Sequence, residues 1–118
     1  MPNILIVDDH AAFRFEARRL LETEGFTVIG EVADGEAALT FAMEHRPDVL
    51  LLDIGLPDID GFAVADRLAA LQPPIPVILT SSRDGAIYGA RIGNATSLGF
   101  LRKDELSGDA IRELMGAA

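Results

Sequence analysis

Several features are absent from this chain of 118 residues. There is no cysteine, which excludes disulfide bonds and thiolate metal sites and is compatible with a reducing compartment. The apolar run after Met-Pro-Asn is too short for a signal peptide or a membrane span, and no basic segment precedes it. The glycine-rich nucleotide-binding motifs and the spacing of a zinc site are also missing. We therefore expect a cytoplasmic protein without a membrane segment.

Positive charge is scarce. The formal net charge is -9, and nine arginines accompany a single lysine, Lys103. An acidic surface repels nucleic acid and anionic lipid, so we expect no direct contact with either.

Short apolar runs alternate with segments of helical period. Runs that are apolar on both faces are typical of central strands in a parallel sheet. The runs predict strands at 4–7, 49–52 and 77–79, with a more polar edge strand at 26–32 and a short strand at 98–101. Helices are predicted from apolar residues of helical spacing: Phe13, Ala17, Leu20 and Leu21; Leu39, Ala42 and Met43; Phe62, Ala65, Leu68 and Leu71; Ile111, Leu114 and Met115. Gly25 is predicted to end the first helix and Pro47 the second. The alternation predicts an α/β fold with a five-stranded parallel sheet, doubly wound as (βα)5.

A fourth helix is expected at about 84–93, where glycine recurs at Gly85, Gly89 and Gly93. Each glycine inside a helix costs about 1 kcal/mol relative to alanine. Two interpretations remain open: a flat stripe for close packing, or a weakly formed helix.

Polar residues follow the predicted strands. Asp8 and Asp9 follow the first strand, Asp53 the third and Ser81 the fourth, and Lys103 follows the fifth. Ligands of open α/β sheets bind beyond the carboxyl ends of the strands. Clustered carboxylates favour a hard cation such as Mg²⁺, while a lysine and a hydroxyl suit phosphate oxygens. Such a site could move a phosphoryl group onto a carboxylate.

Each of these residues also has a structural interpretation. An aspartate after a strand is often a loop residue, and Asp8-Asp9 could cap a helix. Ser81 could be a turn residue and Lys103 a solvated side chain. His10 follows the acid pair and could contact the site, but it is interpreted as an exposed residue at a helix start. The joint placement at four strand ends favours the functional interpretation.

Four motifs resemble the response-regulator receiver domain: Ile-Val-Asp8-Asp9-His, Leu-Leu-Asp53-Ile-Gly-Leu-Pro57-Asp-Ile-Asp60-Gly61, Pro76-Val-Ile-Leu-Thr-Ser81-Ser82 and Gly99-Phe100-Leu-Arg-Lys103. The resemblance runs from about residue 3 to 115 and implies the flavodoxin-like strand order 2-1-3-4-5.

The resemblance also implies roles for individual residues. Asp53 would accept the phosphoryl group and Lys103 would bind it. Mg²⁺ would be held by Asp9, Asp53 and the Gly55 carbonyl, with Asp8 acting directly or through water. Ser81 would move toward the phosphate, and Phe100 would turn inward as the switch aromatic.

Two positions depart from the family pattern. Asp104 follows Lys103, where many receivers have proline, and this leaves the geometry of that loop open. Phe100 replaces the commoner tyrosine and lacks a hydroxyl, so its switch would act by packing alone.

The resemblance implies a two-component signalling switch that catalyses only its own phosphorylation and dephosphorylation. The expected donor is a histidine kinase or a phosphotransfer protein, and the responding face is helix 4, strand 5 and helix 5. We expect residues 1–118 to form one receiver domain without an output domain. The output would be a separate protein or a missing DNA-binding domain, and phosphorylation could produce a homodimer.

Two other functions are weighed against this one. A phosphatase with an aspartate nucleophile needs a second aspartate two residues later, where this chain has Gly55. A phosphorylation-independent binding module would not need the acidic residues that the chain carries.

Overall fold

The computed structural model describes residues 2–82 and 88–116. Five parallel strands form one sheet in the order β2-β1-β3-β4-β5, which confirms the predicted fold class and strand order. The strands are β1 (Asn3–Val7), β2 (Thr27–Val32), β3 (Val49–Asp53), β4 (Val77–Ser81) and β5 (Gly99–Arg102). β2 lies at one edge, as its polar sequence predicts, and the three apolar strands are central.

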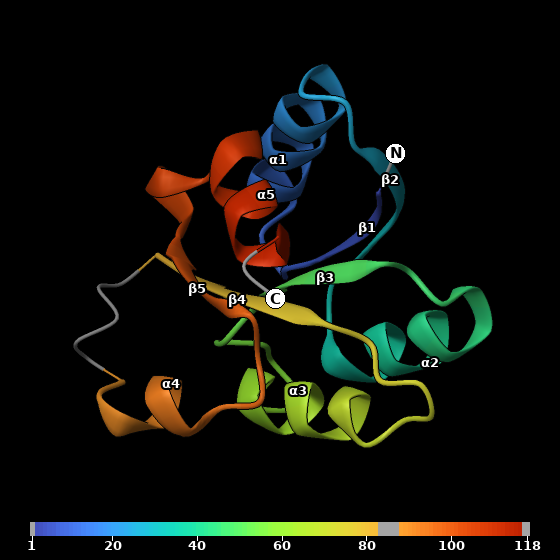
Figure 1. Cartoon of the computed structure of the whole chain (residues 1–118), viewed down its shortest axis with the longest axis vertical. Helices are drawn as coiled ribbons and strands as arrows, with labels where there is room; N and C mark the ends of the chain where they lie inside the picture. Colours follow the sequence, from blue (N-terminus) through green and yellow to red (C-terminus); the bar gives the residue numbers. More distant parts are fainter. Residues whose placement is uncertain (1, 83–87, 117–118) are drawn as a thin grey trace.

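Helices cover both faces of the sheet (Figure 1). In the described residues these are α1 (Ala11–Thr23), α2 (Gly35–His45), α3 (Gly61–Ala69), α4 (Ala90–Asn94) and α5 (Gly108–Gly116), with a 3-10 turn η2 (Lys103–Glu105) after β5. Figure 1 shows α1 and α5 on one side of the sheet and α2, α3 and α4 on the other. This is the doubly wound arrangement.

Two apolar clusters, one on each face, explain the continuous apolar runs. Alternate residues of a strand point to opposite faces. In β1, Ile4 and Ile6 pack with α1 and α5, whereas Leu5 and Val7 pack with α2 and α3. All four are buried, so β1 has no polar face.

The ends of the first two helices follow local sequence signals. Gly25, with a φ of 94°, ends α1, and Phe26 N–H donates to Leu21 O at 2.9 Å. Asp34 caps α2 by accepting from Ala37 N–H at 2.8 Å. Arg46 ends α2 with a left-handed φ of 48°, directly before Pro47.

The expected helix at 84–93 is wrong in its extent. Residues 83–87 lie outside the described residues, so Gly85 cannot be placed. Tyr88 and Gly89 form a turn, and the helix begins only at Ala90. Gly89 has a φ of 52°, and a Cβ on either Gly89 or Gly93 would meet no atom within 4 Å. Neither glycine therefore serves close packing, which removes the stripe interpretation for these two positions.

Met43 lies in α2, as the helical spacing predicts, but 56% of it is exposed, so it does not belong to the buried face of that helix. The buried residues of α2 are Gly35, Ala38, Leu39 and Ala42. Among the described residues, no helix has the length and apolar character needed to cross a membrane.

Candidate phosphoacceptor and metal site

The ends of three central strands bring the predicted polar residues to one edge of the sheet. Asp8 follows β1 and is fully buried; Asp53 ends β3 with 5% exposure and Ser81 ends β4 with 4%. Strand register pairs Val7 with Leu52 and Asp53 with Thr80, so the chain leaves β1, β3 and β4 at the same level. The parallel sheet thereby converts separate positions in the sequence into one cluster.

Carboxylates gather closely in this cluster. Single ligand atoms of Asp8, Asp9, His10 and Asp53 all lie within 4.8 Å of one another. Lys103 reaches them from η2, with its Nζ 2.6 Å from Asp8 Oδ2 and 3.6 Å from Asp53 Oδ2. The lysine is thus poised to neutralise negative charge on Asp53 or on a group attached to it.

Burial raises the pKa of Asp53, and the neighbouring Asp8 carboxylate raises it further. The Lys103 ammonium and the Gly55 N–H, which donates to Asp53 Oδ1 at 3.3 Å, lower the same pKa. A second positive charge at this point would favour the ionised, nucleophilic form of Asp53.

The residues present fit a hard divalent cation. Asp8 Oδ2 is buried and accepts no hydrogen bond among the described residues, and its ion-pair partner is the Lys103 ammonium, 2.6 Å away. Buried carboxylate oxygens need a partner, and Mg²⁺ takes oxygen ligands from one or two carboxylates together with phosphate oxygens. The acidic pocket of Asp8, Asp9 and Asp53 is compatible with Mg²⁺.

The loop after β3 is tied down at several points. Ile54 N–H donates to Thr80 O at 2.9 Å, and Gly61 N–H donates to Ile54 O at 3.0 Å. A Cβ on Gly61 would lie 2.7 Å from Asp53 O, so only glycine fits at this start of α3. Asp58 accepts from the N–H groups of Gly35 and Glu36, and these bonds lower its pKa. The loop therefore fixes the backbone around Asp53 relative to α2 and α3.

Three residues that the sequence analysis did not assign to the site contact it. His10 is exposed at the start of α1, as expected, yet its Nδ1 lies 3.0 Å from Asp8 Oδ1 and 3.1 Å from Asp9 Oδ1. Arg14 donates to Asp8 O at 2.6 Å. The position of His10 directly after the two aspartates indicates in the sequence that it could contact them. The contact of Arg14 with the Asp8 carbonyl depends on how the first turn of α1 folds back toward the end of β1, and the sequence does not indicate it.

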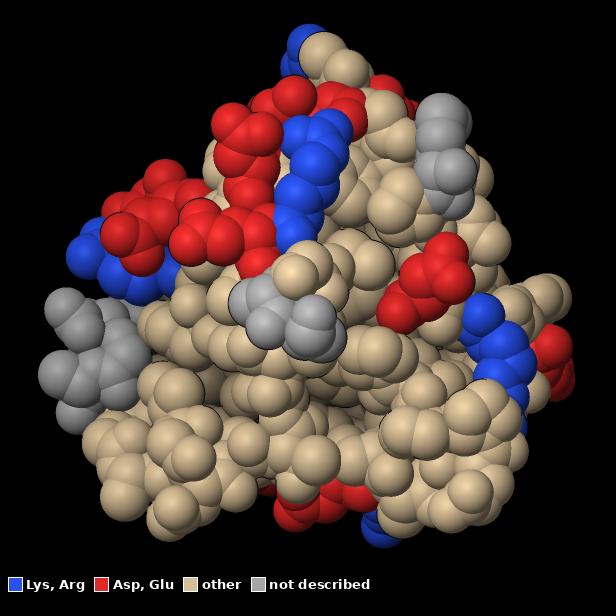
Figure 2. Space-filling view, in the orientation of Figure 1, with Lys and Arg blue, Asp and Glu red and all other residues tan. Residues whose placement is uncertain are grey.

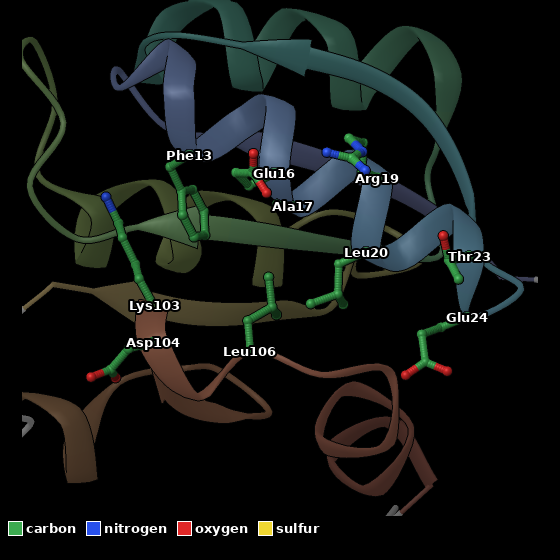
Figure 3. Close-up of a pocket in the computed structure, with 10 residues that line it drawn as sticks. All are labelled: Phe13, Glu16, Ala17, Arg19, Leu20, Thr23, Glu24, Lys103, Asp104 and Leu106. Carbon is green, nitrogen blue, oxygen red and sulfur yellow. The ribbon is translucent and has the colours of Figure 1, made fainter.

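Phe13 is the third of these residues. The Lys103 Nζ lies 4.8 Å from the centre of the Phe13 ring, a cation–π distance. Figure 3 shows the two side chains next to each other at one end of a groove of about 510 Å³, which continues between α1 and the 103–106 segment. Phe13 thus holds Lys103 from the α1 side.

Asp104, which stands where many receivers have proline, belongs to η2. Its Oδ2 forms an ion pair with Arg102 Nη2 at 2.5 Å. Phe100 is half-buried in β5, and Gly55 is exposed in the loop after β3. Ser81 Oγ lies 3.0 Å from the hydroxyl of Tyr88, a contact that no sequence signal indicated.

The fold and the site together define a class: a doubly wound (βα)5 domain that gathers carboxylates and a lysine at the carboxyl ends of its strands. The chain belongs to the response regulator receiver domain family, which matches residues 4–115. It is therefore a receiver domain of the kind found in two-component response regulators.

Known proteins support this assignment. The chain is 41% identical over 105 residues to a transcriptional regulator of Pseudomonas aeruginosa, covering 89% of this chain and 51% of that protein. It is 33% identical to the transcriptional regulatory protein DegU of Brevibacillus brevis, over 93% of this chain and 47% of DegU. The chain spans about half the length of these curated relatives.

Solved structures agree. The signal receiver domain of NarL from Mycobacterium tuberculosis superposes with a TM-score of 0.90 at 32% identity, covering 99% of this chain and 98% of that one. The receiver domain of a modulated diguanylate cyclase from Desulfovibrio desulfuricans gives a TM-score of 0.84 at 32% identity, covering 100% and 93%.

Proposed function

We propose that this receiver domain accepts a phosphoryl group on the Asp53 carboxylate, with Mg²⁺, as the switch of a two-component system. The observation that carries the proposal is the buried Asp53 carboxylate with the Lys103 ammonium 3.6 Å away and two further carboxylates beside it. Ser81, Lys103 and Asp53 are the reacting or binding groups. Asp8, Asp9, Asp53 and the carbonyl of Gly55 would hold the metal.

In the proposed step an Asp53 oxygen attacks the phosphorus of a phosphohistidine or an acyl phosphate. A phosphorus–oxygen bond to Asp53 forms as the bond to the donor breaks, and the donor keeps that electron pair. Lys103 and the Ser81 hydroxyl bind phosphoryl oxygens. Mg²⁺, when bound, neutralises charge on the phosphoryl group and on the carboxylates.

We propose a histidine kinase or phosphotransfer protein as the donor and the α4-β5-α5 face as the responding surface. α4 has five residues and none of them is buried, so this element has little packing to resist a change. In this view Asp and Glu gather in the upper part, where α1 and α5 lie, whereas the lower part around α3 and α4 is largely uncharged (Figure 2).

The test is intact mass after incubation with acetyl phosphate. We expect one phosphoryl adduct on the wild type with Mg²⁺, none without it, and none on Asp53→Asn. Asp66→Asn, a change away from the site, should keep the adduct. Absence of an adduct together with undetectable Mg²⁺ binding would favour a phosphorylation-independent module instead.

A further inference from the structure

The hydroxyl of Ser81 is engaged by the only tyrosine of the chain. Ser81 Oγ and Tyr88 Oη lie 3.0 Å apart, and Ser81 is 4% exposed. A hydroxyl has one donor and two acceptor positions. A phenol is more acidic than an aliphatic alcohol, so Tyr88 is the better donor and Ser81 the acceptor. In that orientation the Ser81 proton can be donated to another oxygen while the bond to Tyr88 persists.

The ring of Tyr88 contacts two further elements. Its centroid lies 6.0 Å from that of Phe62 in α3 and 6.4 Å from that of Phe100 in β5, at interplanar angles of 64° and 56°. Both separations are within the range of favourable aromatic pairs. Tyr88 therefore contacts the end of β4 through its hydroxyl and both α3 and β5 through its ring.

Tyr88 also stands at the start of α4. Arg91 N–H donates to Tyr88 O at 3.1 Å, in the turn that leads into the helix. The Arg91 guanidinium is 4.4 Å from the Phe62 ring centre and 2.6 Å from Asp60 Oδ2. Because no residue of α4 is buried, contacts of this kind hold the helix against the rest of the domain.

We propose that Tyr88 is a positioning residue for the phosphoryl group and the link between Ser81 and α4. Its hydroxyl orients Ser81 to donate to a phosphoryl oxygen on Asp53, and its ring passes the displacement of Ser81 to Phe100 and to the start of α4. Phe100 has no hydroxyl. In the aromatic pair of Tyr88 and Phe100, the hydroxyl is therefore the one on Tyr88, and it contacts Ser81. This inference rests on the proposed phosphorylation of Asp53.

The chain itself contains the probe. Tyr88 is the single tyrosine and there is no tryptophan, so tyrosine emission reports this one residue. The experiment adds beryllium fluoride, a phosphoryl mimic, and Mg²⁺ to the whole chain. We expect the emission to change in the wild type and in Ser81→Thr, which keeps a hydroxyl, and to remain constant in Ser81→Ala. Thr80→Val is the matched control, because the Thr80 hydroxyl is buried and has no hydrogen-bond partner among the described residues; it should respond as the wild type does.

A double-mutant cycle measures the coupling directly. Tyr88→Phe keeps the ring and removes only the hydroxyl. It should slow adduct formation from acetyl phosphate by about three- to tenfold, the equivalent of one neutral hydrogen bond. In the Ser81→Ala background the same change should have no further effect. A purely structural role would lower the melting temperature while leaving these rates additive.

Two failures are distinguishable by mass spectrometry. A normal phosphoryl adduct with unchanged Tyr88 emission, or with additive rate effects, overturns this inference and leaves the proposed function intact. No adduct under any condition, together with undetectable Mg²⁺ binding, overturns both.

Discussion

At the scale of single residues, the site combines ordinary side chains in an unusual environment. Asp53 is buried beside Asp8, and both facts oppose its ionisation, while Lys103 favours it. Fixing three carboxylates close together stores electrostatic repulsion that a cation or a phosphoryl-binding lysine relieves. The same residues that provide chemistry therefore reduce the stability of the fold.

A first prediction concerns the pH dependence of stability. The pKa of Asp53 is raised above its ordinary value of 3.8, so the folded state binds this proton more tightly than the unfolded chain does. The contribution of Asp53 is therefore most favourable below its ordinary pKa, falls as the pH rises to the raised pKa, and stays low above it. We expect Asp53→Asn to be more stable than the wild type at neutral pH without Mg²⁺, and the difference to shrink on acidification.

Urea unfolding between pH 3 and 8 measures this difference. Glu44→Gln, a substitution of an exposed residue, serves as the control. Its free energy of unfolding should differ little from that of the wild type at every pH. An Asp53→Asn protein that is less stable than the wild type at neutral pH would contradict the prediction.

At the scale of elements, the sequence predicted what depends on local pattern. The strands followed from apolar runs buried on both faces, and Gly25 marked the end of α1 correctly. The placement of Asp8 and Asp53 followed from parallel strands ending at one edge. The start of α4 did not follow, because Gly89 takes a positive φ that depends on the turn at Tyr88. The contact between Ser81 and Tyr88 is likewise tertiary: it joins the end of β4 to the turn before α4, and no local pattern in the sequence indicates it.

Glycines give a second prediction, because two of them behave in opposite ways. In Gly61→Ala the new Cβ would lie 2.7 Å from backbone atoms of both Asp53 and Ile54. Relieving these clashes requires a shift of the backbone, which lowers the free energy of unfolding. We expect a loss of about 1–3 kcal/mol. In Gly93→Ala the Cβ enters open space inside α4, and we expect a gain of up to about 1 kcal/mol from the unfolded chain's lost freedom.

Chemical denaturation of the two variants tests the pair, and each is the other's control for adding a methyl group. Equal effects on stability would mean that the start of α3 does not pack against the end of β3 in the way described. Because Gly61 abuts the Asp53 carbonyl, Gly61→Ala should also slow adduct formation, whereas Gly93→Ala should not.

At the scale of the whole molecule, the net charge of -9 complicates any argument about Mg²⁺. Every cation screens a surface of one dominant sign, so salt alone stabilises an acidic domain. A site that binds Mg²⁺ in the folded state adds a separate contribution that grows with concentration as RT ln(1 + [Mg²⁺]/Kd). Stabilisation by bound Mg²⁺ depends on the residues that hold the ion and follows its binding curve. Stabilisation by general screening depends on ionic strength and changes little when one residue is replaced.

The last prediction separates them. With Mg²⁺ at a hundred times its dissociation constant, the wild type should gain about 2.7 kcal/mol beyond the effect of sodium chloride at equal ionic strength. Asp9→Asn should lose most of that excess, because Asp9 offers a ligand atom in the cluster, and should keep the general salt effect, because one charge in nineteen acidic residues changes screening little. Thermal unfolding in matched sodium and magnesium series measures both contributions. If Asp9→Asn retains the full magnesium effect, the stabilisation is diffuse and the carboxylate cluster does not hold the ion.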